Sequence, residues 1–260
     1  MTSSIYGKHS LDKLGTSFLA VDVGNTSIHF AFYSHGRFGK EFRVSTKDVR
    51  LAVAMIRKNN AIAPAVIASV VPKVGQWLKK EIYSKLSVPA YLIGKDLPVP
   101  VVNKYKNPKQ VGIDRLLNAL AAHHDHPREL VIIDFGTAIT FDVVSKKGEY
   151  LGGVIAPGIE ISLEALFQKT ALLPRIHLEH PKNLIGRDTI ESIRVGCSTG
   201  IGGLCDRVVE AISRQYKMKP YVVATGGYAK FMSRYCRSFC QIDPLLIMKG
   251  IRLTYLKKSA

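Results

Sequence analysis

Two short stretches of this sequence place an acidic residue, a glycine and a threonine at the end of an apolar segment. Residues 22–26 are DVGNT, beginning at Asp22, and residues 134–137 are DFGT, beginning at Asp134. A glycine in such a turn lets the backbone approach a phosphate and direct N–H groups toward it, and an aspartate can hold a cation that neutralises phosphate charge. One such turn alone would more often be an ordinary surface turn. Two copies at equivalent places predict a nucleotide-phosphate site.

A third acidic residue, Asp114, follows Gly112 at the expected start of a helix. The positive end of the helix favours an ionised carboxylate, which could accept the proton of an alcohol that attacks a γ-phosphoryl group. Arg115 could hold a substrate carboxylate, since the planar guanidinium suits that geometry. The alternative is that acidic residues are common in first helical turns whatever the function, and spacing alone favours this alternative.

A third glycine-containing turn, Thr225-Gly226-Gly227, follows another apolar segment and resembles a nucleotide-binding turn that opens a helix. Turns of this kind are also frequent for steric reasons, so by itself it is weak evidence. The sequence has no Gly-x-x-x-x-Gly-Lys stretch, which excludes a P-loop.

The elements that would position these residues occur twice. Two sets of three strands are predicted, at 18–23, 28–33 and 38–44 and again at 130–133, 139–144 and 150–155. Single buried strands are expected at 65–71, 91–93 and 221–224. Helices are expected at 46–59, 72–86, 116–124 and 159–170, and from Asp188 onward. This duplication predicts an α/β fold with mixed sheets.

Composition and charge restrict the class of protein. The 260 residues include 37 Lys and Arg against 20 Asp and Glu, a formal net charge of +17. Such a charge attracts anions, including nucleotides and nucleic acids. No block of five consecutive basic residues occurs, and aromatic and basic residues rarely alternate. We therefore expect a generally basic surface with no dedicated nucleic-acid partner.

The location and the cysteines follow from similar reasoning. No apolar run approaches the roughly 20 residues that span a bilayer, and residues 1–16 lack the apolar middle of a secretory signal. These features favour a cytoplasmic protein without a membrane partner. Cys197, Cys205, Cys236 and Cys240 form no Cys-x-x-Cys pair and have no histidine at zinc-finger spacing, so reduced, mostly buried thiols are expected.

Taken together and in order, these motifs resemble the signature set of the type III pantothenate kinases. The matching segments are Asp22 to Thr26, Tyr105, Asn107-Pro108, Val111 to Arg115, Asp134 to Ala138, Gly152-Gly153, Pro157-Gly158 and Thr225 to Gly227. The resemblance runs from about Phe18 to the C-terminal helix. Ile113 stands where the family usually has alanine, and the basic charge and the N-terminal extension are also atypical.

The resemblance implies two duplicated ribonuclease-H-like lobes, as in the actin-like ATPase superfamily that includes sugar kinases and heat-shock proteins. We expect an N-terminal extension at 1–16 and lobes at 17–115 and 116–260. The implied activity is ATP-dependent phosphorylation of pantothenate at its 4′-hydroxyl, the first step of coenzyme A synthesis. The implied cofactors are Mg²⁺ and a monovalent cation, K⁺ or NH₄⁺, and the implied assembly is a homodimer with the site near the subunit interface.

The same resemblance assigns roles to individual residues. The ATP-binding set is Asp22, Val23, Gly24, Asn25, Thr26, Ser27, Ile28, His29, Thr137, Gly226 and Gly227. The pantothenate-binding set is Tyr105, Gly112, Ile113, Asp114, Arg115 and Thr189. Asp114 would be the catalytic proton acceptor, and Asp134 and Asp22 would hold metal ions.

Two alternatives remain open on the sequence. One is another kinase or phosphatase of the same superfamily, acting on a sugar or an acid. The other is a regulatory or nucleic-acid-binding relative like the Bvg accessory factors, without kinase activity. The charge favours this second alternative, whereas the intact Asp22, Asp114 and Asp134 disfavour it.

Overall fold

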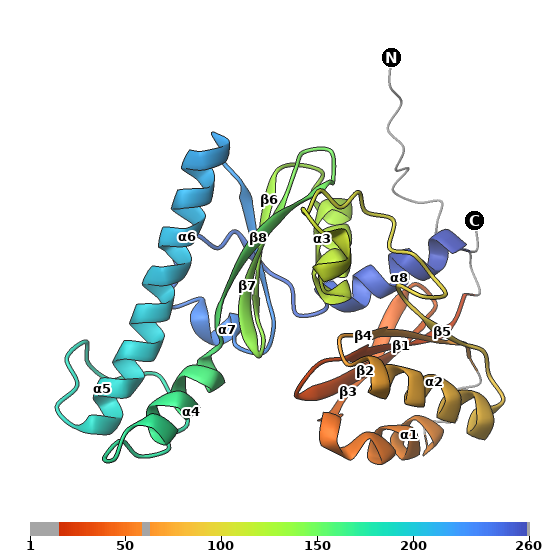
Figure 1. Ribbon diagram of the computed structural model, residues 1–260, viewed down its shortest axis with the longest axis horizontal. Helices are drawn as coiled ribbons and strands as arrows, with labels where there is room; N and C mark the ends of the chain where they lie inside the picture. Colours follow the sequence, from red (N-terminus) through yellow and green to blue (C-terminus); the bar gives the residue numbers. More distant parts are fainter. Residues whose placement is uncertain (1–15, 59–62, 259–260) are drawn as a thin grey trace. The chain divides into compact units, whose positions relative to one another are not determined.

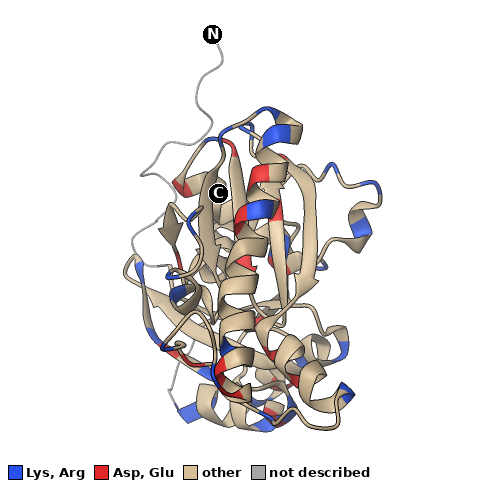
Figure 2. Cartoon of the chain, turned by 90° about the vertical axis from the view of Figure 1, so that its left-hand side faces the viewer, with Lys and Arg blue, Asp and Glu red and all other residues tan. Residues whose placement is uncertain are grey.

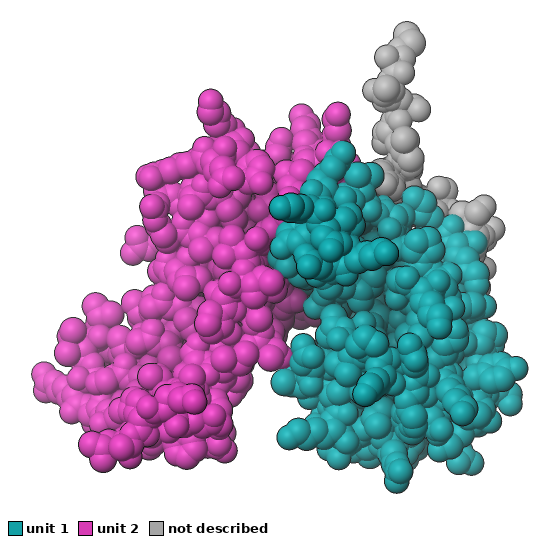
Figure 3. All heavy atoms as spheres, in the orientation of Figure 1, with its two compact units in different colours: residues 1–126, 245–260 teal, residues 127–244 magenta. Residues whose placement is uncertain are grey.

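The computed structural model describes residues 16–58 and 63–258, which form two compact units (Figure 1). Unit 1 contains the chain up to His126 together with residues 245–260, and unit 2 contains Pro127–Pro244 (Figure 3). Each unit has its own five-stranded sheet.

The sheet of unit 1 has the order β3-β2-β1-β4-β5. Its strands are β1 (Phe18–Val23), β2 (Ser27–Ser34), β3 (Arg37–Ser45), β4 (Ala65–Ser69) and β5 (Ala90–Leu92). The first three strands form an antiparallel meander, and β4 pairs in parallel with both β1 and β5. The helical elements are η1 (Thr46–Asp48), α1 (Val49–Lys58), α2 (Pro72–Leu86), η2 (Pro108–Gln110), α3 (Ile113–Asp125) and α8 (Leu246–Lys258).

Helices cover both faces of this sheet. Leu19, Val21 and Val23 of β1 pack against α1 and α2. Phe18 and Ala20, which point to the opposite face, pack with apolar residues of α3 and α8. Both faces of β1 are therefore buried, which explains why this strand is an almost uninterrupted apolar run.

Unit 2 repeats the arrangement with the sheet order β10-β9-β6-β7-β8. Its strands are β6 (Leu130–Phe135), β7 (Ala138–Val144), β8 (Tyr150–Pro157), β9 (Tyr221–Thr225) and β10 (Gln241–Ile242). Its helical elements are α4 (Ile159–Lys169), α5 (Thr189–Val195), η3 (Gly196–Gly200), α6 (Ile201–Tyr216) and α7 (Ala229–Met232). Residues from β6, β7, β9 and these helices share one apolar core.

The two sheets have the same topology, so the duplication predicted from the sequence is confirmed. β1 and β6 are the central strands, each antiparallel to the strand that follows it and parallel to a later one. Asp22 lies opposite His29 in β2, and Asp134 lies opposite Thr140 in β7. Each aspartate is the last residue but one of its central strand.

The units differ from the expected lobes of 17–115 and 116–260 in two ways. Helix α3 begins at Ile113, so the expected boundary falls inside a helix. The chain also returns to unit 1 after Pro244, because α8 packs on α3; a β-carbon on Gly250 would lie 2.3 Å from the Leu117 carbonyl oxygen. The expected extension at 1–16 lies outside the described residues except for Thr16.

Three elements also differ from the expected ones. The region expected as one helix at 46–59 contains η1 followed by α1, and Asn59 lies outside the described residues. The strand expected at 65–71 ends at Ser69, whose hydroxyl accepts a hydrogen bond from the Val71 N–H before α2 begins. The helix expected from Asp188 is interrupted by the π-helical η3 between α5 and α6.

Charge is unevenly shared between the two units. Unit 1 carries 22 basic and 8 acidic residues, whereas unit 2 carries 15 basic and 12 acidic residues. Among the described residues, the basic positions are spread over many elements (Figure 2). Most of the net charge of +17 therefore belongs to unit 1.

Three of the cysteines, Cys197, Cys205 and Cys236, are buried and Cys240 is exposed; all four are free, as expected. No helix in the described part of the chain is both long and apolar enough to span a lipid bilayer.

Candidate active site

The turn between β1 and β2 is held by its own backbone and by a residue that follows β3. The Gly24 N–H donates to the Ser27 carbonyl at 2.9 Å. The Thr46 hydroxyl donates to the Gly24 carbonyl at 2.8 Å, and the Thr46 N–H donates to the Thr26 carbonyl at 3.0 Å. Asn25 and Thr26 are exposed at the tip of the turn. The structure thus presents an ordered, accessible turn directly after Asp22.

Side chains next to this turn differ in what they can offer a ligand. Val23 and Ile28 are fully buried in the core, so only their backbone could contact a nucleotide. His29 is 4% exposed, and its Nε2 lies 2.8 Å from a carboxylate oxygen of Glu41. Burial lowers the pKa of His29, and the nearby Arg43 lowers it further, while Glu41 acts in the opposite direction. His29 is therefore a neutral hydrogen-bonding group at neutral pH.

The corresponding corner of unit 2 is assembled from three turns. Asp134 is half-buried at the end of β6, and the Gly136 N–H donates to the Ala138 carbonyl at 3.2 Å. A β-carbon on Gly226 would lie 2.5 Å from Asp134 Oδ1, so the turn after β9 touches this carboxylate. A β-carbon on Gly158 would lie 2.1 Å from the Thr137 carbonyl oxygen. These contacts bring Asp134, Thr137 and Gly226 together at one corner of unit 2.

A side-chain hydrogen bond links two of the elements at this corner. The Tyr228 hydroxyl donates a hydrogen bond to the Glu160 carboxylate, which joins the turn after β9 to the first turn of α4. Burial and the Glu160 carboxylate raise the pKa of Tyr228 to about 12. Tyr228 therefore stays protonated and remains a donor at physiological pH. The sequence reasoning missed this pair, because its partners are 68 residues apart.

Asp114 lies in the first turn of α3, on the helix that covers the same face of the sheet to which Asp22 points. Its Oδ1 accepts a hydrogen bond of 2.9 Å from the Arg115 N–H, and a β-carbon on Gly112 would lie 2.3 Å from that oxygen. Burial raises the pKa of Asp114, and the Arg115 hydrogen bond and charge offset part of that shift. A half-buried carboxylate with a raised pKa is a better proton acceptor than an exposed one.

The other residues expected at the acceptor side of unit 1 lie before α3. The Tyr105 N–H donates to Asn103 Oδ1 at 3.0 Å, and Asn103 Nδ2 donates to the Pro108 carbonyl at 3.2 Å. Asn103, which the sequence reasoning did not select, thus organises the loop that carries Tyr105. The Ile113 side chain lies against Gly94, where a β-carbon would be 3.3 Å from Cδ1. Its bulk is accommodated by a glycine.

Comparison with known proteins decides the family. The sequence profile described as type III pantothenate kinase matches residues 18–211, a span that includes Asp22, Asp114 and Asp134. A type III pantothenate kinase from Citrifermentans bemidjiense is 36% identical over 255 residues, covering 93% of this chain and 99% of the relative. The chain belongs to the type III pantothenate kinase family.

Solved structures agree on the fold. A Campylobacter jejuni protein assigned to the Baf family of transcriptional activators has a TM-score of 0.61 at 20% identity, covering 93% of this chain and 98% of the other. A Sinorhizobium meliloti protein assigned as a 2-dehydro-3-deoxygalactonokinase has a TM-score of 0.59 at 11% identity, covering 93% and 99%. These similarities, together with the two matching sheets, confirm the duplicated ribonuclease-H-like fold class with mixed sheets.

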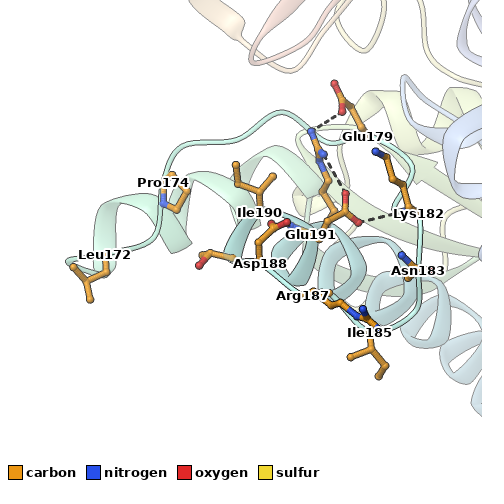
Figure 4. A pocket seen from close by; sticks show the side chains of 13 residues that line it. Leu172, Pro174, Glu179, Lys182, Asn183, Ile185, Arg187, Asp188, Ile190 and Glu191 are labelled. Carbon is orange, nitrogen blue, oxygen red and sulfur yellow. Dashed lines mark hydrogen bonds and ion pairs between the residues drawn. The ribbon is translucent and has the colours of Figure 1, made fainter.

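Thr189, the remaining residue that the family pattern assigns to pantothenate, lines a separate cavity of about 860 Å³ in unit 2 (Figure 4). Asp134, Thr137 and Gly226 are not among the residues that line this cavity. Its lining combines apolar side chains with equal numbers of basic and acidic ones. Among these, Arg194 contacts Glu179 at 2.5 Å and Glu191 at 3.3 Å.

The start of α5 has one of the two hydrogen bonds of the predicted capping box. Asp188 Oδ1 accepts from the Glu191 N–H at 2.8 Å, which confirms the predicted helix start. The Glu191 carboxylate does not complete a capping box; it accepts from the Lys182 N–H at 3.2 Å and contacts Arg194. Thr189 itself is exposed on the first turn of the helix.

The acidic residues suit a metal ion that arrives with a nucleotide. Among residues 16–58 and 63–258, no group of three or more His, Cys, Asp or Glu side chains could hold a metal ion. Mg²⁺ commonly uses one or two protein carboxylates, with the remaining ligands supplied by phosphates and water. The single carboxylates of Asp22 in unit 1 and Asp134 in unit 2 fit that pattern.

Proposed function

We propose that this chain catalyses the ATP-dependent phosphorylation of pantothenate at its 4′-hydroxyl, the first step of coenzyme A biosynthesis. The observation that carries the proposal is the family match over residues 18–211, which contains all three acidic residues at the ends of strands or the start of a helix. The 36% identity to a named kinase along 93% of the chain supports the same activity.

On the donor side, the three glycine-containing turns are proposed to bind ATP through backbone N–H groups. In unit 1 the contacts are assigned to Asp22, Val23, Gly24, Asn25, Thr26, Ser27, Ile28 and His29. In unit 2 they are assigned to Thr137, Gly226 and Gly227. What supports the assignment in unit 2 is that Gly226 and the turn after β6 share one corner with Asp134. When bound, Mg²⁺ would offset charge on the phosphates, with Asp22 and Asp134 as the protein carboxylates.

On the acceptor side, Asp114 is the proposed proton acceptor. The 4′-hydroxyl oxygen forms the new bond to the γ-phosphorus, the bond to the ADP oxygen breaks, and the hydroxyl proton passes to the Asp114 carboxylate. Its raised pKa supports this role, because burial makes the carboxylate more basic. Arg115 is proposed to pair with the pantothenate carboxylate, and Tyr105, Gly112, Ile113 and Thr189 are the further proposed contacts.

The remaining features expected from the family stay predictions. They are a requirement for K⁺ or NH₄⁺ at a site that includes Asp134, a homodimer with the active site near the subunit interface, and a cytoplasmic location. Each is open to direct measurement by assays in different salts, by light scattering and by cell fractionation.

A coupled assay of ADP release tests the function. We expect saturable release that depends on pantothenate, is supported by KCl or NH₄Cl, and is much weaker in NaCl. Sugars and short hydroxy acids serve as matched alcohol controls and should give only the background rate. Faster turnover with one of those alcohols would show that the chain is a different kinase of the superfamily.

The regulatory alternative is not favoured by the family match. The Campylobacter jejuni structure is 20% identical to this chain, which supports a shared fold alone. The basic character of unit 1 is compatible with polyanion binding, but the acidic residues of the proposed site are all retained. Salt-sensitive DNA binding together with no ADP release would support the regulatory alternative.

A further inference from the structure

The residue that follows the third strand of unit 1 makes two contacts with the turn after Asp22. Thr46 comes directly after β3, and Ser45, the last residue of β3, pairs with Ser27. The Thr46 hydroxyl and N–H hydrogen-bond to the carbonyl oxygens of Gly24 and Thr26, at 2.8 and 3.0 Å. Both carbonyls are thereby drawn toward the end of β3.

Unit 2 places a different residue at the same position. Pro157, the last residue of β8, pairs with Ala138, just as Ser45 pairs with Ser27. The next residue is Gly158, the counterpart of Thr46. A β-carbon on Gly158 would lie 2.1 Å from the Thr137 oxygen and 2.8 Å from the Gly136 oxygen. In each repeat, the residue that follows the third strand therefore lies against carbonyl groups of the turn between the first and second strands.

The orientation of these carbonyls determines what the turn can bind. A trans peptide is planar, with its C=O and the following N–H on opposite sides. Fixing the Gly24 and Thr26 carbonyls therefore also fixes the N–H groups of Asn25 and Ser27. A carbonyl turned toward a phosphate would repel it, whereas an N–H attracts it.

We propose that Thr46 and Gly158 are positioning residues that hold the two turns with their N–H groups available to the phosphates of the nucleotide. This inference rests on the proposed kinase function. Thr46 acts through two hydrogen bonds. Gly158 acts because its backbone lies so close to the turn that a side chain at this position would clash with it. Neither residue is required to touch the substrate.

Thr46→Val and Thr46→Ser form a matched pair. Valine has nearly the shape of threonine but lacks the hydroxyl, and serine keeps the hydroxyl. Loss of the bond to Gly24 should raise the KM for ATP about 2- to 10-fold, from the net strength of one hydrogen bond. The KM for pantothenate should stay within a factor of about two, and serine should restore most of the ATP affinity.

Two controls separate positioning from general stability. The first control is Thr254→Val, in α8 of the same unit. This variant loses the hydrogen bond of 2.9 Å that the Thr254 hydroxyl donates to the Gly250 carbonyl. It should lower the melting temperature without changing the KM for ATP. Gly158→Ala should raise the KM for ATP, whereas Gly203→Ala, where a β-carbon meets nothing within 4 Å, should not.

The outcomes are distinct from those that test the kinase function. If the wild type releases ADP and Thr46→Val has an unchanged KM for ATP, the positioning role is wrong. If the wild type releases no ADP, the kinase proposal fails, and calorimetric titration with ADP and Mg²⁺ then decides the positioning role. Weaker ADP binding by Thr46→Val than by Thr46→Ser supports the role; equal binding, or no ADP binding by the wild type, overturns it.

Discussion

Gly226 approaches Asp134 so closely that a β-carbon at residue 226 would lie 2.5 Å from Asp134 Oδ1. The same β-carbon would lie 2.7 Å from the backbone N and C of Phe135. Gly226 also has a φ of +90°, a conformation that side chains rarely adopt. Because β6 and β9 are parallel neighbours, with Asp134 opposite Thr225, the two strand ends converge at this point. Backbone conformation and space both require glycine here.

The first prediction is that Gly226→Ala impairs use of ATP. The added methyl group must displace the Asp134 carboxylate or the backbone at the end of β6, so we expect the KM for ATP to rise by about tenfold or more. Steady-state kinetics with ATP varied and pantothenate saturating measure this. Gly203→Ala is the control, and as a helix position with open space it should keep full activity and gain about 0.5–1 kcal/mol of stability. Wild-type kinetics for Gly226→Ala would argue against a nucleotide contact at this corner.

The second prediction concerns the proposed base. Asp114→Asn keeps the oxygen that accepts the Arg115 N–H but cannot take up a proton at physiological pH. Turnover should fall by about 10²–10⁴-fold, the usual contribution of a general base. ATP binding, measured by calorimetry, should change little. A variant with near-normal turnover would remove Asp114 from this role.

The third prediction follows from the raised pKa of the same residue. A carboxyl group whose pKa is higher in the folded chain than in the unfolded chain stabilises the fold below the unfolded pKa of about 3.9. That stabilisation is lost as pH rises through the folded pKa. At pH 7 the charged Asp114 therefore lowers the free energy of unfolding. Asp114→Asn should therefore melt at a higher temperature than the wild type at pH 7, and the difference should shrink as pH approaches 4. Thermal melts across this range test the sign; a variant that is less stable at pH 7 would contradict it.

The sequence predicted what depends on local signals. The acidic turns, the duplicated strands and the start of α5 could be predicted because apolar runs, glycine and a capping aspartate lie next to one another in the chain. Asp134 and Gly226 were both selected, and the structure brings them into contact. The contact itself was not predicted, because it depends on the parallel pairing of β6 with β9, which lie some ninety residues apart in the chain.

The features that were missed depend on register and on long-range packing. Thr46 contacts Gly24 only because Ser45 pairs with Ser27, and a register shift of one residue would remove that contact. Asn103 was missed because its side chain forms hydrogen bonds with the backbone of Tyr105 and Pro108, and no motif in the sequence indicates these bonds. The return of the chain to unit 1 was not foreseen, because the sequence pattern of α8 does not indicate that this helix packs on α3.

The last prediction concerns the thiols. Cys240 is exposed, whereas Cys197, Cys205 and Cys236 are buried. The pKa of Cys236 is raised by its hydrogen bond with Cys205 and by burial, and burial raises the pKa of Cys197. Because the thiolate is the reactive form, a disulfide reagent such as dithionitrobenzoate should modify one thiol rapidly at pH 8 and the others only as the chain opens.

Cys240→Ser identifies the fast thiol. This variant should lose the rapid phase while the slow phase and the melting temperature remain as in the wild type. In guanidinium chloride the wild type should show four reactive thiols and the variant three, in line with the four cysteines of the sequence. A second thiol reacting rapidly in the folded protein would mean that the core formed by α6, α7 and β9 opens far more readily than its burial implies.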